Sequence, residues 1–342
     1  MRVVVTGGYG FIGSHVVRWL LQHVPTVEVV NLDVLTYAGN PANLADVAKD
    51  PRYRWMRVSV SDYAGVYPLF QSHPIDAVIH LAAESHVDRS IETGLPFVET
   101  NVVGTEVLLE IARKTGVGRF LQVSTDEVYG SLGPDGLFRE TDPVRPNSPY
   151  AASKAAADLL VQAAHRTNGQ NVVITRCSNN FGPYQFPEKL IPLWITNALE
   201  GKPWPIYGDG QNVRDWLYVE DHVEALWLAL TRGQAGEIYN IGGHNEKTNW
   251  DVADALLSRL GLTRSVVVPV PDRAGHDRRY ALDATKAEQE LGWRPRHDWE
   301  TALTATVAWY QTHRDWWQSI KQGTYQDDYR RRYPTLAEPQ GD

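Results

Sequence analysis

The chain has 342 residues, of which 43% are hydrophobic and 22% charged, so it is long enough for two lobes around a sizeable core and lacks the composition of a disordered protein. The net charge of −8 argues against nucleic acid or an anionic membrane as the main partner, although it leaves room for a local phosphate pocket. The single cysteine, Cys177, excludes an intrachain disulfide and a cysteine-cluster metal site. With no apolar run of about 20 residues and no signal peptide before the first strand, a soluble, cytoplasmic protein is expected.

Alternating strand and helix patterns fill the first half of the chain. Apolar, β-branched runs predict strands over residues 2–7, 27–33, 54–60, 76–83, 119–124 and 171–177. Helical spacing of apolar residues predicts helices over 12–22, 101–114 and 150–166. Strands that are apolar throughout and separated by helices indicate a parallel sheet covered on both faces. The predicted fold class is therefore α/β, a Rossmann-type doubly wound sheet with ligands at the carboxyl ends of its strands.

A glycine-rich turn follows the first strand and opens the first helix. The segment "VVVTGGYGFIGSHVV" carries Gly7, Gly10 and Gly13, where tight backbone turns and close approach of a phosphate need residues without side chains. Asp33 ends the second strand, about 20 residues beyond, where a carboxylate accepts hydrogen bonds from an adenosine ribose and repels a 2′-phosphate. Because the turn occurs in its strand–turn–helix context, the sequence predicts a site for NAD rather than NADP.

Two adjacent acids end the fifth predicted strand. In "VSTDEVYG" the apolar run gives way to Ser124, Thr125, Asp126 and Glu127. Two carboxyl groups this close tend not to ionise together, so one stays protonated while the other accepts protons. The two acids therefore either face solvent in a loop or serve chemistry that needs an acid and a base side by side.

Tyr150 and Lys154 lie one turn apart on the predicted helix in "PNSPYAASKAAAD", with Ser148 as its N-cap and Pro149 at its first position. A free phenol is a poor base at neutral pH, and the ammonium group together with the helix N-terminus is expected to favour the phenolate. The pair is therefore a candidate proton acceptor for a hydroxyl whose carbon loses hydride.

The regular alternation of strand and helix patterns ends near Ser178, where prolines and aromatic residues become frequent. The predicted division is a dinucleotide-binding domain over 1–178, to which the chain returns around 213–242, and a substrate-binding lobe made mainly of 179–342. His86 and Asp88 have no third ligand at suitable spacing, so no metal site is predicted.

These motifs together resemble the extended short-chain dehydrogenase/reductase superfamily and, within it, the nucleotide-sugar 4,6-dehydratases that act on dTDP-glucose. The match runs from residue 6 to about 283 through "TGGYGFIGS", "LAAESHVDRSI", "VSTDEVYG", "SPYAASKAAAD", "RCSNNFGPYQFPEKLIP" and "GHDRRYALD". The adjacent Asp126 and Glu127 are the discriminating feature, since related epimerases and decarboxylases normally lack them. The resemblance implies that Tyr150, with Lys154, takes the C4 hydroxyl proton, that Glu127 removes the C5 proton, and that Asp126 protonates the leaving C6 hydroxyl. Hydride then returns to C6, C5 is reprotonated, and Thr125 binds the C4 oxygen.

The resemblance also implies the binding residues and the assembly. NAD contacts are expected from Gly7, Gly10, Phe11, Ile12, Gly13, Asp33, Ser59, Val60, Leu81, Ala82, Ala83, Ser85, Tyr150 and Lys154. Substrate contacts are expected from Ser85, Thr125, Asn179, Lys189, Pro205, Tyr207, Arg214, Asn249, Arg273 and His276. Ser59 departs from the usual aspartate near adenine, and Val34 from a frequent basic residue. A homodimer that pairs the helices after "ETNVVGT" and "SPYAASK" is expected.

Three alternatives remain at this point: a dehydratase for another nucleotide sugar such as UDP-glucose, a nucleotide-sugar 4-epimerase, and an inactive NAD-binding sensor or scaffold. The last of these predicts the loss of a tyrosine, lysine, aspartate or glutamate from the motifs, and all four are present.

Overall fold

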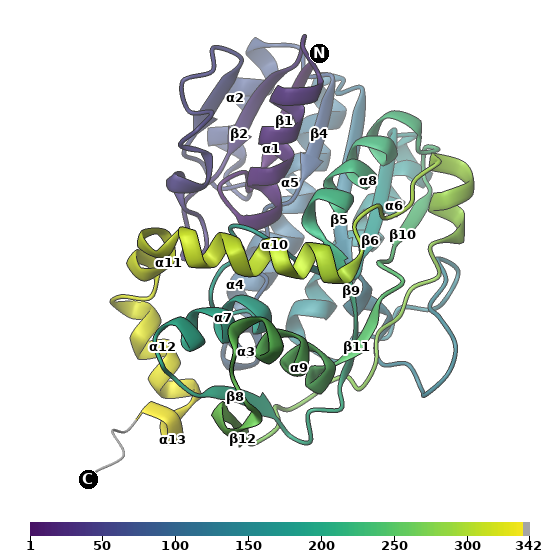
Figure 1. The fold of residues 1–342 in the computed structure, drawn as a ribbon. Helices are drawn as coiled ribbons and strands as arrows, with labels where there is room; N and C mark the ends of the chain where they lie inside the picture. Colours follow the sequence, from purple (N-terminus) through teal and green to yellow (C-terminus); the bar gives the residue numbers. More distant parts are fainter. Residues whose placement is uncertain (338–342) are drawn as a thin grey trace.

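Seven parallel strands form the central sheet of the molecule, which the computed structural model describes over residues 1–337 (Figure 1). Side by side they are β10 (Ile238–Ile241), β6 (Val172–Cys177), β5 (Arg119–Thr125), β4 (Ala77–His80), β1 (Arg2–Thr6), β2 (Glu28–Leu32) and β3 (Tyr53–Met56). The six strands predicted in the first half are all present. The strand order reverses between β1 and β4, which opens a crevice at the carboxyl ends of these strands.

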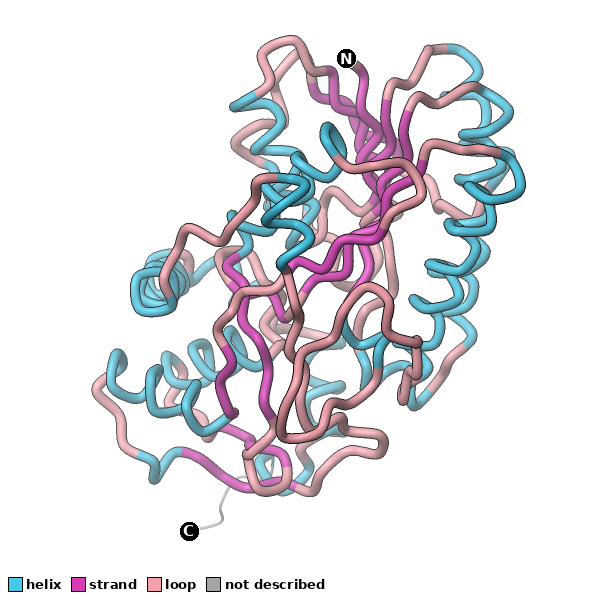
Figure 2. The backbone as a smooth tube through the Cα atoms, turned by 90° about the vertical axis from the view of Figure 1, so that its right-hand side faces the viewer, coloured by secondary structure: helices cyan, strands magenta, loops and turns pink. Residues whose placement is uncertain are grey.

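Both faces of this sheet are buried, as its apolar strands predict. Along β1, Val3 and Val5 point into one core cluster and Val4 into another, because successive side chains alternate between the faces of a strand. The first cluster includes side chains of α1 (Phe11–His23) and α8 (Val219–Arg232). The second includes those of α2 (Tyr63–Ser72), α5 (Gly104–Thr115) and α6 (Pro149–Asn168). Figure 2 shows the large sheet with helices on both sides.

A smaller lobe lies below the sheet in the view of Figure 1. It contains a three-stranded sheet of β11 (Glu246–Thr248), β9 (Val213–Tyr218) and β7 (Asn179–Phe181), and the pair β12 (Val267–Val270) and β8 (Trp204–Tyr207). Its core includes side chains of α7 (Leu190–Leu199), α9 (Asn249–Leu260) and α10 (Trp299–Thr312). Within the range 213–242, α8 and β10 belong to the large sheet and its cover, whereas β9 pairs inside the smaller lobe because its neighbours are β7 and β11.

The C-terminal helices run from the junction of the lobes along the outer edge of the smaller one (Figure 1). They are α11 (Arg314–Ile320), α12 (Thr324–Arg332) and α13 (Pro334–Ala337). The short elements elsewhere are η1 (Pro41–Leu44), α3 (Val87–Glu92), α4 (Leu95–Phe97), η2 (Val98–Val103), η3 (Asp126–Tyr129), η4 (Arg264–Val266) and η5 (Ala287–Leu291). Over residues 1–337, none of the helices has the length and apolar character needed to cross a membrane.

Candidate active site

The end of β5 brings the two acids to the carboxyl edge of the large sheet. Thr125 is the last residue of the strand and the N-cap of η3, because its Oγ1 accepts a hydrogen bond from the Glu127 backbone N–H at 3.3 Å. The same hydroxyl donates to Oδ1 of Asp126 at 3.2 Å. This cap turns the chain sharply, so that Asp126 and Glu127 stay at the strand end and line the cleft there.

Burial gives the two acids unusual proton affinities. Asp126 is 1% exposed, and burial together with the charge of Glu127 raises the pKa of Asp126 well above its usual range. Its Oδ2 atom has no hydrogen-bond partner within residues 1–337. Burial also raises the pKa of Glu127, but the nearby charges of Arg273, Lys189 and Arg214 oppose that shift. Asp126 is therefore the member of the pair that holds a proton more readily, and Glu127 the one that more readily accepts one.

The helix α6 carries the tyrosine and the lysine into the same cleft. The Ser148 hydroxyl accepts a hydrogen bond from the Ala151 N–H at 3.1 Å, and Pro149 is the first helical residue, as predicted. Tyr150 and Lys154 are both buried, and Lys154 Nζ donates to the Val123 carbonyl at 2.7 Å, which ties the ammonium group to β5.

The phenol of Tyr150 differs from the sequence-based expectation. Burial, and then the charge of Glu127, raise the pKa of Tyr150 well above 10, and a hydrogen bond with the Thr125 hydroxyl acts in the opposite sense. The lowered pKa expected from Lys154 and the helix end is not found for this side chain, because burial and the charge of Glu127 act in the opposite direction.

The glycine turn has the close packing that its residue types predict. Gly7 has a φ of +71°, and a Cβ there would lie 2.9 Å from Ala82 N. A Cβ on Gly13 would lie 2.1 Å from the Gly7 carbonyl oxygen, so neither position accepts a side chain. Gly10 is the N-cap of α1 and supplies no side-chain cap, which leaves the N–H groups of the first helical turn for another acceptor.

Asp33 lies beside this turn and is 8% exposed. Its carboxylate accepts hydrogen bonds from the Tyr9 N–H at 2.9 Å and the Leu35 N–H at 2.8 Å, so its orientation is fixed while further lone pairs remain. Burial raises the pKa of Asp33, and these two backbone hydrogen bonds oppose the shift.

One cleft joins all of the predicted catalytic and cofactor residues. Its lining includes Gly7, Gly10, Phe11, Ile12, Gly13, Asp33, Ser59, Val60, Leu81, Ala82, Ala83, Ser85, Thr125, Asp126, Glu127, Tyr150 and Lys154. Of the predicted substrate residues, Ser85, Thr125, Asn179 and Lys189 line the same cleft. Buried polar atoms along it, Ser124 Oγ, Ser178 Oγ and Asn179 Oδ1, have no partner among residues 1–337.

The remaining predicted substrate residues lie beyond this lining. Arg214 is buried and Arg273 is partly buried, and both exert their charge on Glu127, which places them near the acid pair. Tyr207, at the end of β8, meets the His276 ring edge to face with ring centroids 6.0 Å apart. Pro205 lies on the same strand, and the buried Asn249 opens α9.

Two buried polar residues next to the predicted ones were not predicted as site residues. Glu188 lines the cleft, where it accepts a hydrogen bond from the Tyr37 hydroxyl at 3.1 Å and lies 3.4 Å from His86 Nε2. Tyr280 is 3% exposed, stacks under Arg214 at 4.3 Å, and has its pKa raised by burial and by the charge of Glu127. Each lies inside a quoted motif, "FPEKLIP" or "GHDRRYALD", but its position depends on contacts between segments that are distant in sequence.

Known proteins resemble this chain over nearly its whole length. A family model described as GDP-mannose 4,6 dehydratase matches residues 4–306. The dTDP-glucose 4,6-dehydratase of Salmonella typhimurium is 50% identical over 351 aligned residues, which cover 95% of this chain and 97% of that protein.

Solved structures agree with these matches. A dTDP-glucose 4,6-dehydratase from Streptomyces venezuelae, solved with NAD bound, has a TM-score of 0.92 and 53% identity over 94% of this chain and 100% of its own. The UDP-glucose 4-epimerase of Thermus thermophilus in complex with NAD has a TM-score of 0.85 and 34% identity over 92% of this chain and 100% of its own.

Proposed function

The chain belongs to the dTDP-glucose 4,6-dehydratase family, and on this premise we propose that it converts dTDP-glucose into dTDP-4-keto-6-deoxyglucose, the form used in deoxysugar synthesis. The observation that carries the proposal is the pair of adjacent acids, Asp126 and Glu127, with unequal proton affinities, in the cleft that also holds Tyr150 and Lys154. An oxidoreductase that only moves hydride at C4 has no need of such a pair.

Tyr150 begins the reaction as the acceptor of the C4 hydroxyl proton, and Thr125 holds the C4 oxygen. The Thr125 hydroxyl is the group that acts to lower the pKa of Tyr150. Burial lowers the pKa of Lys154, and the hydrogen bond to the Val123 carbonyl fixes its Nζ beside β5. The phenol is shielded from water by burial, so the proton that it gains stays within the cleft.

Glu127 and Asp126 then act at neighbouring carbons. A ketone at C4 acidifies the C5 proton, which Glu127 removes, because Arg273, Lys189 and Arg214 favour its ionised form. Asp126 is the proton donor to the leaving C6 hydroxyl, because burial and the charge of Glu127 keep it protonated. The two carboxyl groups titrate as a coupled pair.

The residues of the cleft fit NAD. A diphosphate would bind at the uncapped first turn of α1 above Gly7 and Gly13, positions that no side chain could occupy, and Asp33 has lone pairs left for a ribose. When bound, NAD⁺ would take the C4 hydride and, in its reduced form, return it to C6 while Glu127 returns a proton to C5; its positive charge would also favour the phenolate of Tyr150.

Incubation with dTDP-glucose in deuterium oxide tests the proposal. The expected product is a 6-deoxy-4-keto sugar with deuterium at C5, identified by NMR and mass spectrometry. An unlabelled C4 epimer would instead establish the epimerase alternative, which the 34% identity to a UDP-glucose 4-epimerase keeps in view. Binding of NAD without turnover of any nucleotide sugar would point to a sensor or scaffold. A parallel incubation with UDP-glucose measures the preference between the two bases.

A homodimer is part of the same proposal. Large apolar side chains are exposed at Leu95 (74%) and Leu159 (54%), and also at Ile91, Val98 and Val103, on α3, α4, η2 and α6. On α6, Ala152 and Leu159 are both exposed and lie two turns apart on one face, while Ala151 is buried, so a small residue lies on the outer face. Light scattering on the wild type and on Leu159→Glu tests the dimer, which the charged residue is expected to weaken. We place the reaction in the cytoplasm, where nucleotide sugars are made.

A further inference from the structure

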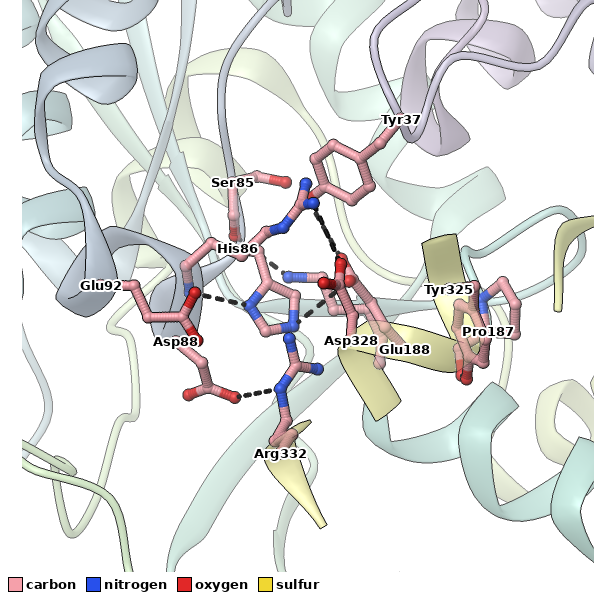
Figure 3. Close-up of polar contacts among 12 residues, drawn as sticks. Tyr37, Ser85, His86, Asp88, Glu92, Pro187, Glu188, Tyr325, Asp328 and Arg332 are labelled. Atoms are coloured by element: carbon pink, nitrogen blue, oxygen red, sulfur yellow. Dashed lines mark hydrogen bonds and ion pairs between the residues drawn. The ribbon is translucent and has the colours of Figure 1, made fainter. Parts of the chain in front are cut away.

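Asp88 connects the C-terminal helix to two predicted substrate-binding residues. It lies on α3, and its Oδ1 is 3.2 Å from Arg273 Nη1 while its Oδ2 is 3.4 Å from Arg332 Nε. The Tyr207 hydroxyl donates to the same Oδ2 at 3.3 Å, and the Tyr333 hydroxyl lies 3.3 Å from the Tyr207 oxygen, to which it can donate. We refer to these five residues as the Asp88 cluster. Figure 3 shows Arg332 of α12 pointing at Asp88.

The Asp88 cluster is shielded enough for its charges to act on one another. The side chains of Asp88, Arg273 and Arg332 are 17%, 25% and 14% exposed, so solvent screens them only partly. One carboxylate therefore serves two guanidinium groups. Arg273 Nε is a buried donor without a partner among residues 1–337, which leaves this side chain with hydrogen-bonding capacity for a ligand.

Further contacts hold α12 against this part of the site. Asp328 pairs with Arg89 at 3.0 Å, and the Tyr325 hydroxyl donates to the Pro187 carbonyl at 2.9 Å, directly before Glu188 and Lys189 of the cleft (Figure 3). The helix is thus attached to α3 and to the segment that carries the cleft lysine. By contrast, Arg330 on the same helix pairs with Asp327 at 3.6 Å and with no other acid in the described part of the chain, and both side chains are mostly exposed.

We propose that Arg332 is a positioning residue for the nucleoside diphosphate of the substrate, acting through Asp88 on Arg273 and Tyr207. This role of Arg332 rests on the proposed function. With Arg332 in place, the charge of Asp88 is shared between two guanidinium groups, so Arg273 keeps donors for a phosphate, and Tyr207 is held in place by Asp88. Without Arg332, the Asp88 carboxylate pairs with Arg273 alone. It then keeps the Arg273 guanidinium away from the substrate and repels an incoming diphosphate. The helix α12 is in this way part of substrate recognition.

Titration calorimetry with dTDP on the NAD-loaded full chain tests the proposal. Arg332→Gln is expected to weaken dTDP binding about tenfold, and Arg332→Lys by less than about threefold, because lysine keeps the charge. Arg330→Gln is the matched control from the same helix and should bind as the wild type does. In steady-state assays Arg332→Gln should raise KM and leave kcat within about twofold, a split that general loss of structure would not give.

The double variant Asp88→Asn/Arg332→Gln decides whether Asp88 transmits the effect. In the Asp88→Asn background, loss of Arg332 should change dTDP affinity by less than about twofold. An equal loss in both backgrounds, or wild-type affinity in Arg332→Gln, would overturn the proposal. Arg332→Met, which retains the aliphatic stem, replaces the glutamine variant if that one unfolds, with the same outcomes. If the wild type itself binds no dTDP, the proposed function fails instead.

Discussion

The acid–base end of the cleft and the nucleoside end are assembled from different lengths of chain. Thr125, Asp126 and Glu127 are consecutive at one strand end, and Tyr150 and Lys154 are one turn apart on a neighbouring helix. The Asp88 cluster instead brings together four separate segments between residues 88 and 333. Local geometry thus fixes the groups that make and break bonds, while tertiary packing fixes those that would hold the nucleotide. Substitutions at the first end should change kcat, and those at the second should change affinity.

Glu127→Gln should have the largest effect, a loss of kcat for dehydration, and should leave the affinity for the nucleotide unchanged. Glutamine keeps the shape of the side chain but cannot accept the C5 proton, so kcat for dehydration should fall about 10²- to 10⁴-fold. Oxidation at C4 does not need Glu127, so the near-ultraviolet absorbance of the reduced cofactor should rise and persist. Stopped-flow absorbance combined with product analysis measures both, with Glu99→Gln on η2 as a control outside the cleft. Full turnover by Glu127→Gln would remove the role assigned to this residue.

Arg273→Gln should act mainly on affinity. Loss of a charged donor to a phosphate costs about 1.5–3 kcal/mol, so dTDP should bind about 10- to 150-fold more weakly. The charge of Arg273 also counteracts the burial that raises the pKa of Glu127. Its removal should therefore raise that pKa further, and the acidic limb of the kcat profile should move to higher pH.

A matched control for this variant is Arg278→Gln, on the same loop, whose guanidinium pairs with the exposed Asp209. That control should leave both affinity and pH profile unchanged. A kcat loss in Arg273→Gln that persists at high pH, with unchanged dTDP affinity, would place Arg273 with the chemical residues instead.

Asp126→Asn should separate stability from activity. The pKa of Asp126 is raised in the folded chain, so between its unfolded and folded values the native state binds a proton that the unfolded state has released. The free energy of unfolding therefore falls with rising pH in that window, by up to about 1.4 kcal/mol per pH unit for one proton. Asparagine removes this dependence. The variant should be inactive yet more stable than wild type at neutral pH.

Urea unfolding at mildly acidic and at neutral pH measures this difference, and the exposed Asp135→Asn is the control. A wild type and an Asp126→Asn variant that lose stability in parallel as the pH rises would mean that Asp126 is ionised in the folded chain. It could not then serve as the proton donor.

The contrast between locally assembled groups and groups brought together from distant segments also explains which features of the site could be predicted from the sequence. The glycine turn, the adjacent acids and the Tyr150–Lys154 spacing are local, and the strand and helix patterns suffice to bring them to one sheet edge. Five of the six early strands lie close to where their apolar runs predict, because a strand buried on both faces needs such a run. The third, predicted over 54–60, forms over 53–56 at the edge of the sheet, where it is partly exposed.

Features that depend on contacts between distant segments could not be predicted from the sequence. The pairing of β9 with β7 and β11 depends on the smaller lobe as a whole, and the sequence of β9 does not specify it. The raised pKa of Tyr150 depends on how completely the folded chain excludes water, which a helical spacing of two residues cannot report. Glu188 and the Asp88–Arg332 pair are recognisable only once distant segments are in contact.

Ser59→Asp should have the smallest effect, a modest gain in NAD affinity, and it tests the part of the cleft that would hold the adenine. Ser59 lines the cleft and shares a 2.9 Å hydrogen bond with Ser61 Oγ, at a position where the family pattern usually has an aspartate near adenine. A carboxylate accepting from the adenine amino group should add about 1 kcal/mol, or roughly a fivefold gain in NAD affinity, with kcat unchanged. Ser61→Asp, one step outside the cleft lining, is the control and should add nothing. Equal or weaker NAD binding in Ser59→Asp would mean that adenine is held by contacts other than the one at this position, and that the departure from the family pattern at residue 59 has no bearing on affinity.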